Sequence, residues 1–112
     1  ISPGMNVAAE ALFLNTSQLR RVEMVAPNSA IGQNTTEALQ SGLVLGYTGL
    51  VTGMVARFKN ELGENAKVVG TGGLADIIAQ EADVFDAINP DLTLIGLRLI
   101  YEKNQPPAKV LD

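Results

Sequence analysis

The segment over residues 38–56 carries no charged side chain, and it constrains the fold more than any other part of the chain. Before it, Asn34 is typical of a helix N-cap, and Glu37 follows three residues later as in a capping box. After it, Gly63 is typical of a helix end. The pattern predicts one helix from about residue 34 to 62, roughly 40 Å long. At 112 residues, the chain can form one domain, or part of one, around this helix.

The predicted helix carries four glycines on one face. Spacings of 4, 3 and 4 separate Gly42, Gly46, Gly49 and Gly53, and at about 100° per residue the four lie within an arc of roughly 60°. Each helix-interior glycine costs about 1 kcal/mol relative to alanine, so close packing of a neighbouring helix has to offset the loss. The neighbour is either a second subunit or another helix of the same subunit, and the sequence leaves both open.

An uncharged segment of this length also raises the question of a transmembrane span. The glycines make this one polar, as do five side chains with a hydroxyl or amide group, namely Gln40, Ser41, Tyr47, Thr48 and Thr52. That polarity argues against a bilayer core. We expect a buried helix and no membrane.

Composition excludes several classes of function. Lys and Arg number 8 against 12 Asp and Glu, for a net charge of −4, and the positive residues do not cluster, so we expect no nucleic-acid partner. The chain has no Cys and no His, which rules out zinc clusters, thiolate nucleophiles and Ser-His triads within it. A cytoplasmic setting fits the absence of cysteine. Asp83, Asp86 and Asp91 are interpreted as a solvated turn and helix start, with no metal site.

The remaining pattern predicts an α/β fold in which helix predominates. We expect helices over residues 5–14, 74–80 and 91–102, short strands over 21–25, 67–70 and 84–88, and a tail over 105–112. In the first helix, the apolar side chains at helical spacing are Val7, Ala8, Ala11, Leu12 and Leu14. In the last helix, Leu92, Leu94, Ile95 and Leu99 are expected to face inward. Tyr47 and Tyr101 lie in apolar helix patterns, which favours core or interface positions over stacking platforms.

A strand, a glycine pair and a helix follow one another at Thr71-Gly72-Gly73-Leu74. Glycine can take positive φ and lets a flat ligand approach the backbone, while the start of the following helix offers unpaired N–H groups. A nucleotide could bind there. The same arrangement also occurs at turns that bind nothing, so the spacing alone does not decide between the two.

Six segments, taken in order, resemble those of the type III pantothenate kinases: Ile1-Ser2-Pro3-Gly4, Ile31-Gly32-Gln33-Asn34-Thr35-Thr36-Glu37-Ala38, Gln40-Ser41-Gly42, Gly46-Tyr47, Thr71-Gly72-Gly73-Leu74-Ala75 and Asn89-Pro90-Asp91-Leu92-Thr93-Leu94-x-Gly96-Leu97. The family belongs to the actin-like ATPase superfamily. The resemblance implies that residues 1–104 are the C-terminal half of an actin-like, ribonuclease H-like kinase and part of a longer polypeptide. It also implies a homodimer that phosphorylates pantothenate with ATP, the first step of coenzyme A biosynthesis.

The resemblance further implies where the functional residues lie. The family's Asp-x-Gly-Asn, Gly-Ala-Asp-Arg and Asp-x-Gly-Thr motifs, which supply phosphate contacts and the catalytic Asp, do not occur in this chain. We therefore expect no catalytic residue here, and we expect Mg²⁺ with ATP and a monovalent cation (K⁺ or NH₄⁺) to be held by the missing half. Thr35 matches the family's pantothenate-contacting threonine, and Gly72 and Gly73 match the glycines beside the adenosine. Gln33, where many relatives carry Lys, departs from the family's pattern.

Three other functions remain compatible with the sequence. Some members of the family were first described as accessory factors for toxin-gene transcription, so a non-catalytic accessory or transcriptional regulatory factor is one. A different actin-like sugar kinase is the second, and a dimerisation module of the same fold is the third. For Thr35 itself, the alternative to a substrate contact is that Asn34 and Thr35 only cap the helix.

Overall fold

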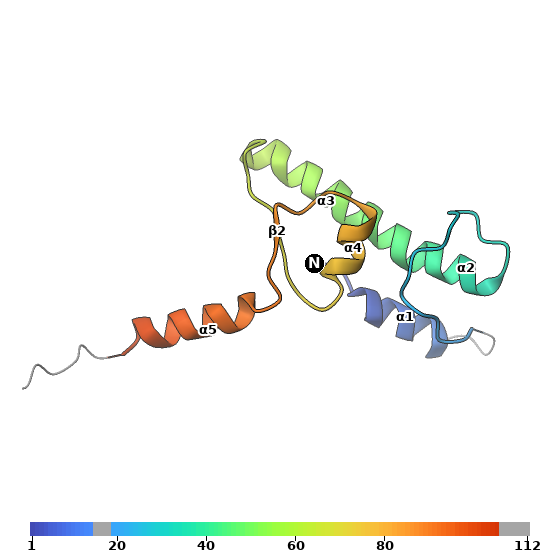
Figure 1. Cartoon of the computed structure of the whole chain (residues 1–112), viewed down its shortest axis with the longest axis horizontal. Coiled ribbons are helices and arrows are strands. Elements are labelled where there is room, and N and C mark those ends of the chain that lie inside the picture. The colour runs from blue at the N-terminus through green and yellow to red at the C-terminus, as the bar shows by residue number, and fades with distance from the viewer. Residues whose placement is uncertain (15–18, 106–112) are drawn as a thin grey trace, which may run out of the picture.

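The structure, a computed structural model, describes residues 1–14 and 19–105 and is a helix-rich α/β arrangement with a small parallel sheet (Figure 1). In chain order its elements are α1 (Met5–Leu14), α2 (Thr35–Gln40), η1 (Ser41–Leu45), α3 (Gly46–Leu62), β1 (Val69–Gly70), α4 (Ala75–Glu81), β2 (Ala87–Ile88) and α5 (Leu92–Lys103). The tail expected over residues 105–112 lies outside the described residues, apart from its first residue.

Helices α2, η1 and α3 join into one helix over Thr35–Leu62, which confirms the long helix expected from the sequence. Asn34 is its N-cap: the Oδ1 atom accepts a hydrogen bond from the Glu37 backbone N–H at 2.9 Å. The reciprocal bond comes one residue earlier than in a standard capping box, because the Glu37 carboxylate accepts from the Gln33 N–H at 2.8 Å. Gly63 ends the helix with φ +100° and donates to the Lys59 carbonyl.

One turn of this helix differs from the regular pattern. The element η1 is a π-helix, which the sequence pattern did not indicate. The hydroxyl of its first residue, Ser41, donates a hydrogen bond to the Ala30 carbonyl at 2.7 Å and ties the preceding loop to the helix. π-helical turns are rare inside α-helices and often occur at functional sites.

The glycine face of the long helix is exposed and packs against nothing in the part of the chain that the structure describes. A Cβ added at Gly42, Gly49 or Gly53 would meet no atom of that part within 4 Å, apart from the helix's own backbone. One at Gly46 would meet only the Ser41 carbonyl, at 4.0 Å. The described residues therefore supply no packing at this face that would offset the cost of these glycines.

By length and composition alone, the Thr35–Leu62 helix could cross a membrane. One such helix is weak support for a span, because core helices of soluble proteins pass the same test. Those core helices are mostly buried, however, and only 11% of the apolar window of this helix is buried, so the expectation of a buried helix is wrong for the described residues. The expectation that the chain has no membrane partner stays a prediction.

The core joins α1, the long helix and α4. Met5, Ala9, Leu43 and Ile78 form its buried cluster. The helix α1 has the predicted bounds, but its inward face was predicted wrongly: Val7 and Leu14 are exposed, and Met5 and Ala9 are the buried positions. The reason is that α1 is apolar on most sides, so the spacing of its apolar residues does not select one face.

The strands β1 and β2 pair in parallel, with Val69 opposite Ala87 and Gly70 opposite Ile88, and α4 forms the crossover between them. The strands are shorter than the predicted 67–70 and 84–88. The Asp86 side chain adds two hydrogen bonds just before the paired strands. Its carboxylate accepts from the Val68 N–H at 2.8 Å and from the Lys67 ammonium at 3.0 Å. These two bonds, the backbone one first, hold the pKa of Asp86 below its ordinary value.

The strand predicted over residues 21–25 does not form. Its alternation is present, since Val22 and Met24 pack against the core while Glu23 between them is exposed. What is missing among the described residues is a strand to pair with. The Glu23 carbonyl accepts instead from the Val25 N–H at 2.9 Å and from the Gln40 side chain at 3.1 Å, and a single extended segment without a ladder partner is not a sheet strand.

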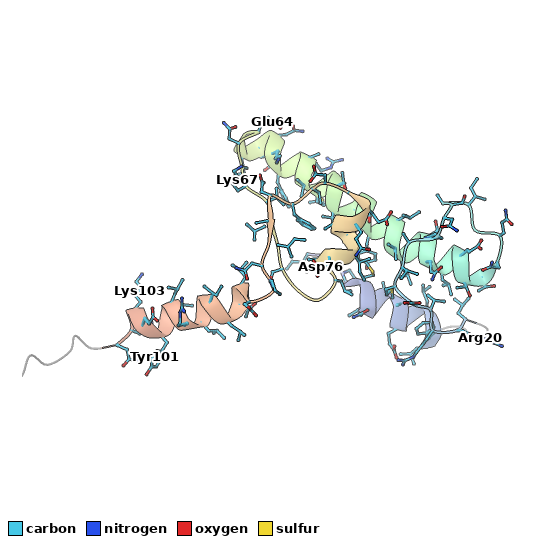
Figure 2. The ribbon with its side chains drawn as sticks, in the orientation of Figure 1. Arg20, Glu64, Lys67, Asp76, Tyr101 and Lys103 are labelled. Atoms are coloured by element: carbon cyan, nitrogen blue, oxygen red, sulfur yellow. The ribbon has the colours of Figure 1, made fainter. Side chains whose placement is uncertain are left out.

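The helix α5 forms close to its predicted bounds but does not face inward as expected. It projects away from the other helices (Figure 1), and none of its residues is buried. Leu92, Leu94 and Leu99 are exposed, and so is Tyr101, which the sequence pattern placed in a core or interface. Figure 2 shows Tyr101 and Lys103 on this free helix. The apolar residues are there, but no described element of the chain lies against them.

Candidate functional site

The glycine turn expected to bind a ligand forms as predicted. It follows β1 directly and leads into α4, with Gly72 at φ +92°, a conformation that residues with a Cβ rarely adopt. The Gly72 carbonyl accepts from the Ala75 N–H at 3.3 Å, which closes the turn at the start of α4. In parallel α/β sheets this position, beyond the carboxyl end of a strand, is where ligands commonly bind.

The turn forms one wall of a cavity of about 780 Å³. Gly72 and Gly73 both line it, and Tyr47 and Val51 of α3 form a second wall. The first turn of α1 closes a third side. Ligand pockets typically measure about 300–1,000 Å³ and are mostly apolar, so the cavity has the size and the lining to take a nucleoside.

Thr35 lies in a different cavity, of about 340 Å³, at the start of the long helix. Arg20, Asn34 and Thr36 contribute its polar lining, and Val22 and Leu39 its apolar lining. In Figure 2, Arg20 lies at the end of the molecule where the long helix begins. Within the described residues the Thr35 hydroxyl has no hydrogen-bond partner. The N-cap bond of the helix is made by the neighbouring Asn34 side chain.

The structure therefore does not bring the predicted site residues into one cavity. Along the long helix, Thr35 and Tyr47 are 12 positions apart, which is roughly 18 Å at 1.5 Å per residue. The glycine turn lies beside the middle of the helix, near Tyr47 and Val51, and Thr35 lies at its start. A ligand that reached both would have to extend along this half of the helix, or two ligands would have to approach each other along it.

Comparison with known proteins decides the family. A family model described as type III pantothenate kinase matches residues 1–57, half of the chain. The chain belongs to the type III pantothenate kinase family.

Curated proteins named type III pantothenate kinase match nearly all of the chain. The protein of Roseiflexus sp. (strain RS-1) is 51% identical over 105 residues, 94% of this chain and 41% of that protein. The protein of Frankia alni is 48% identical over 104 residues, 93% of this chain and 42% of that protein. The protein of Syntrophobacter fumaroxidans is 50% identical over 106 residues, 94% of this chain and 41% of that protein. The chain thus spans about two fifths of the length of these curated relatives.

Several residues at the two cavities of this family member were not singled out from the sequence. Phe85 lines the larger cavity, and Arg20 lines the smaller one. Tyr47 was expected in a core or interface, and it packs against the core while also lining the larger cavity. Its spacing of four residues from Val51 places both on one helix face, and that pairing is the signal that could have found this wall.

The absence of a metal site at the acidic residues, expected from the sequence, stays a prediction. No group of three or more Asp and Glu side chains in the part of the chain that the structure describes lies close enough together to hold an ion. Asp86 already accepts hydrogen bonds from Lys67 and Val68. It acts as part of the sheet's hydrogen bonding.

Proposed function

We propose that this chain is the C-terminal half of an actin-like kinase that phosphorylates pantothenate with ATP, a cytoplasmic enzyme at the first step of coenzyme A biosynthesis. Membership of the family supports this assignment. The observation that carries it is the cavity of about 780 Å³ whose wall is the Gly72–Gly73 turn. In the proposal, Gly72 and Gly73 pass the adenosine portion of ATP, because backbone without a Cβ lets a flat ring system approach closely.

Thr35 is the proposed contact for pantothenate. It is the first residue of a long helix, where free N–H groups and the helix dipole favour an anion such as the pantothenate carboxylate. The capping alternative is weakened because Asn34 alone makes the N-cap hydrogen bond. The Thr35 hydroxyl, without a partner among the described residues, is free to donate to a substrate.

Replacing Thr35 by Ala tests the substrate contact. An enzyme for this test joins the present chain to the part of the Roseiflexus protein outside the matched 105 residues. Thr35→Ala is expected to raise the KM for pantothenate by about 10-fold to 100-fold, since a hydrogen bond to a charged group contributes roughly 1.5–3 kcal/mol. The KM for ATP is expected to stay within about twofold, because the two cavities lie apart.

Thr36 provides the matched control. It is the next residue and lines the same cavity, but the proposal gives its hydroxyl no role. Thr36→Ala is therefore expected to leave both KM values near those of the unsubstituted enzyme. Equal rises in the two KM values for Thr35→Ala, or the same pantothenate effect in both variants, would rule out the specific contact.

Phosphoryl transfer requires parts that this half is not proposed to supply. A carboxylate has to accept the proton of the pantothenate hydroxyl, and Mg²⁺ has to neutralise the phosphate charge. The acidic groups of the described residues do not fit a metal, so we assign none of them to Mg²⁺ or to the monovalent cation. In the proposal both ions are held by the other half of the enzyme.

The glycine face of the long helix is proposed as the contact surface of a homodimer. It is exposed, and no atom of the described residues approaches it. Two copies packed through Gly46 and Gly49 would bring backbones close enough to offset the cost of glycine inside a helix.

Replacing both Gly46 and Gly49 by Leu tests the dimer. The two side chains would hold the helices apart, so we expect the joined enzyme to sediment as a monomer at concentrations where the unsubstituted enzyme is a dimer. Leucine is also a better helix former than glycine, so helix content by circular dichroism should not fall. A folded variant with the sedimentation coefficient of the dimer would contradict the assignment.

A further inference from the structure

The Tyr47 hydroxyl connects two elements that are far apart in the sequence. It donates to the Pro3 carbonyl at 2.7 Å, across 44 positions of the chain. Pro3 lies just before Gly4, whose carbonyl accepts the first helical hydrogen bond of α1, from Ala8 at 2.9 Å. The bond therefore fastens the entry of α1 to the second residue of α3.

The bond lies beside the larger cavity, because the start of α1 lines that cavity. Residues 4–7, the entry and first turn of α1, form the wall of the 780 Å³ cavity that faces the glycine turn. The other walls are held by the β1–β2 pairing and by the packing of α4, where Ile78 is buried. The residues that lead into α1 are exposed, so core packing does not fix them.

A tyrosine at position 47 is better suited to hold the entry of α1 than a shorter polar residue would be. Its ring packs against the core cluster, which limits the positions of the hydroxyl at low entropic cost. Pro3 has no backbone N–H, so its carbonyl is the only main-chain group by which it can be held. The Ser2 hydroxyl points at the same carbonyl but at 3.4 Å, a much weaker bond.

We infer that Tyr47 is a positioning residue for nucleotide binding, whose hydroxyl holds the entry of α1, at Pro3 and Gly4, at the separation from the Gly72–Gly73 turn that fits adenosine. The inference rests on the proposed function of that cavity. Without the hydroxyl, Met5 and Ala9 still anchor α1 in the core, so the helix stays in place while its entry moves more freely. The cavity then loses a defined wall and binds the nucleotide less tightly.

Tyr47→Phe tests this inference in the joined enzyme, because it removes the hydroxyl and keeps the ring. ATP is the probe, titrated into ¹⁵N-labelled protein while the resonances of Gly72 and Gly73 are followed. The dissociation constant is expected to rise about threefold to tenfold, the usual effect of losing one hydrogen bond. Hydrogen exchange of the Ala8 amide, in the first turn of α1, is expected to become faster.

Two control variants separate this role from a general loss of hydroxyl groups. Tyr101→Phe makes the same change on the exposed helix α5, away from the cavity. Ser2→Ala removes the weaker donor to the same Pro3 carbonyl. Both are expected to bind ATP as the unsubstituted joined enzyme does and to exchange the Ala8 amide at the same rate.

The outcomes distinguish this inference from the proposed function. If ATP shifts Gly72 and Gly73 equally in Tyr47→Phe and in the unsubstituted joined enzyme, the positioning role is overturned and the nucleotide site stands. If ATP shifts neither residue in the unsubstituted joined enzyme, the nucleotide site itself is overturned, and the inference with it. Loss of the folded state in Tyr47→Phe, seen by circular dichroism, would reveal a general structural role and would also overturn positioning.

Discussion

Leu43→Ala is expected to lower the free energy of unfolding by about 3 kcal/mol, within the range of roughly 2–5 kcal/mol for a buried leucine replaced by alanine. Leu43 is 4% exposed and lies in η1, where it joins Met5, Ala9 and Ile78 in the core cluster. Removing its side chain leaves a cavity where α1, the long helix and α4 meet. Those elements cannot close the gap together, because each is also held elsewhere.

Urea unfolding followed by circular dichroism measures this effect. Leu97→Ala is the matched control, because Leu97 is 59% exposed on α5, and exposed substitutions usually change stability by about 0.5 kcal/mol or less. We expect the midpoint of Leu43→Ala to fall clearly below that of Leu97→Ala with little change in slope. Similar midpoints for the two variants would mean that the cluster around Leu43 is not the core of this chain.

Much of the local structure could be predicted because it depends on neighbouring residues alone. The start of the long helix follows from the side chains of Asn34 and Glu37, which bond to backbone groups within four positions. Its end follows from Gly63. The turn at Gly72 follows from glycine's freedom to take positive φ. None of these requires knowledge of a distant contact.

Two of the errors have one cause in common. The strand expected over residues 21–25 and the inward face expected for α5 both depend on a second surface, and alternation or helical spacing does not say whether that surface is present. Val22 and Met24 show the alternation without a partner strand among the described residues. The chain spans about two fifths of its relatives' length. The apolar pattern alone does not show whether the second surface lies within the described residues.

Some residues of the candidate site could be predicted from the sequence and others could not, because the sequence pattern reports local structure and not distant contacts. The glycine pair at Gly72 and Gly73 predicts a turn, and in the structure that turn lines a cavity. The wall formed by α3 depends on how the helices pack, so spacing could place Tyr47 and Val51 on one helix face but could not show that this face lines a cavity. The roles of Thr35 and of the glycine pair as ligand contacts came from the family resemblance and stay predictions.

Gly32→Ala is expected to lower the free energy of unfolding by more than the roughly 1 kcal/mol that loss of an N-cap costs. A Cβ on Gly32 would lie 2.5 Å from the Ala38 nitrogen, 2.8 Å from its Cα and 2.9 Å from the Glu37 carbonyl carbon. All three are backbone atoms, which cannot rotate aside. Overpacking of this kind costs roughly 1–3 kcal/mol, and displacing the loop also breaks the bond from the Gln33 N–H to Glu37.

The expected result is a loss of about 3 kcal/mol in the free energy of unfolding, made up of the overpacking and the roughly 1 kcal/mol of a lost cap. Gly4→Ala is the control, because a Cβ there meets nothing within 4 Å. In the joined enzyme, Gly32→Ala should also raise the KM for pantothenate, since the loop that moves leads directly into Thr35. Normal stability in Gly32→Ala would show that the loop can shift freely, and the cavity around Thr35 would then not be a preformed site.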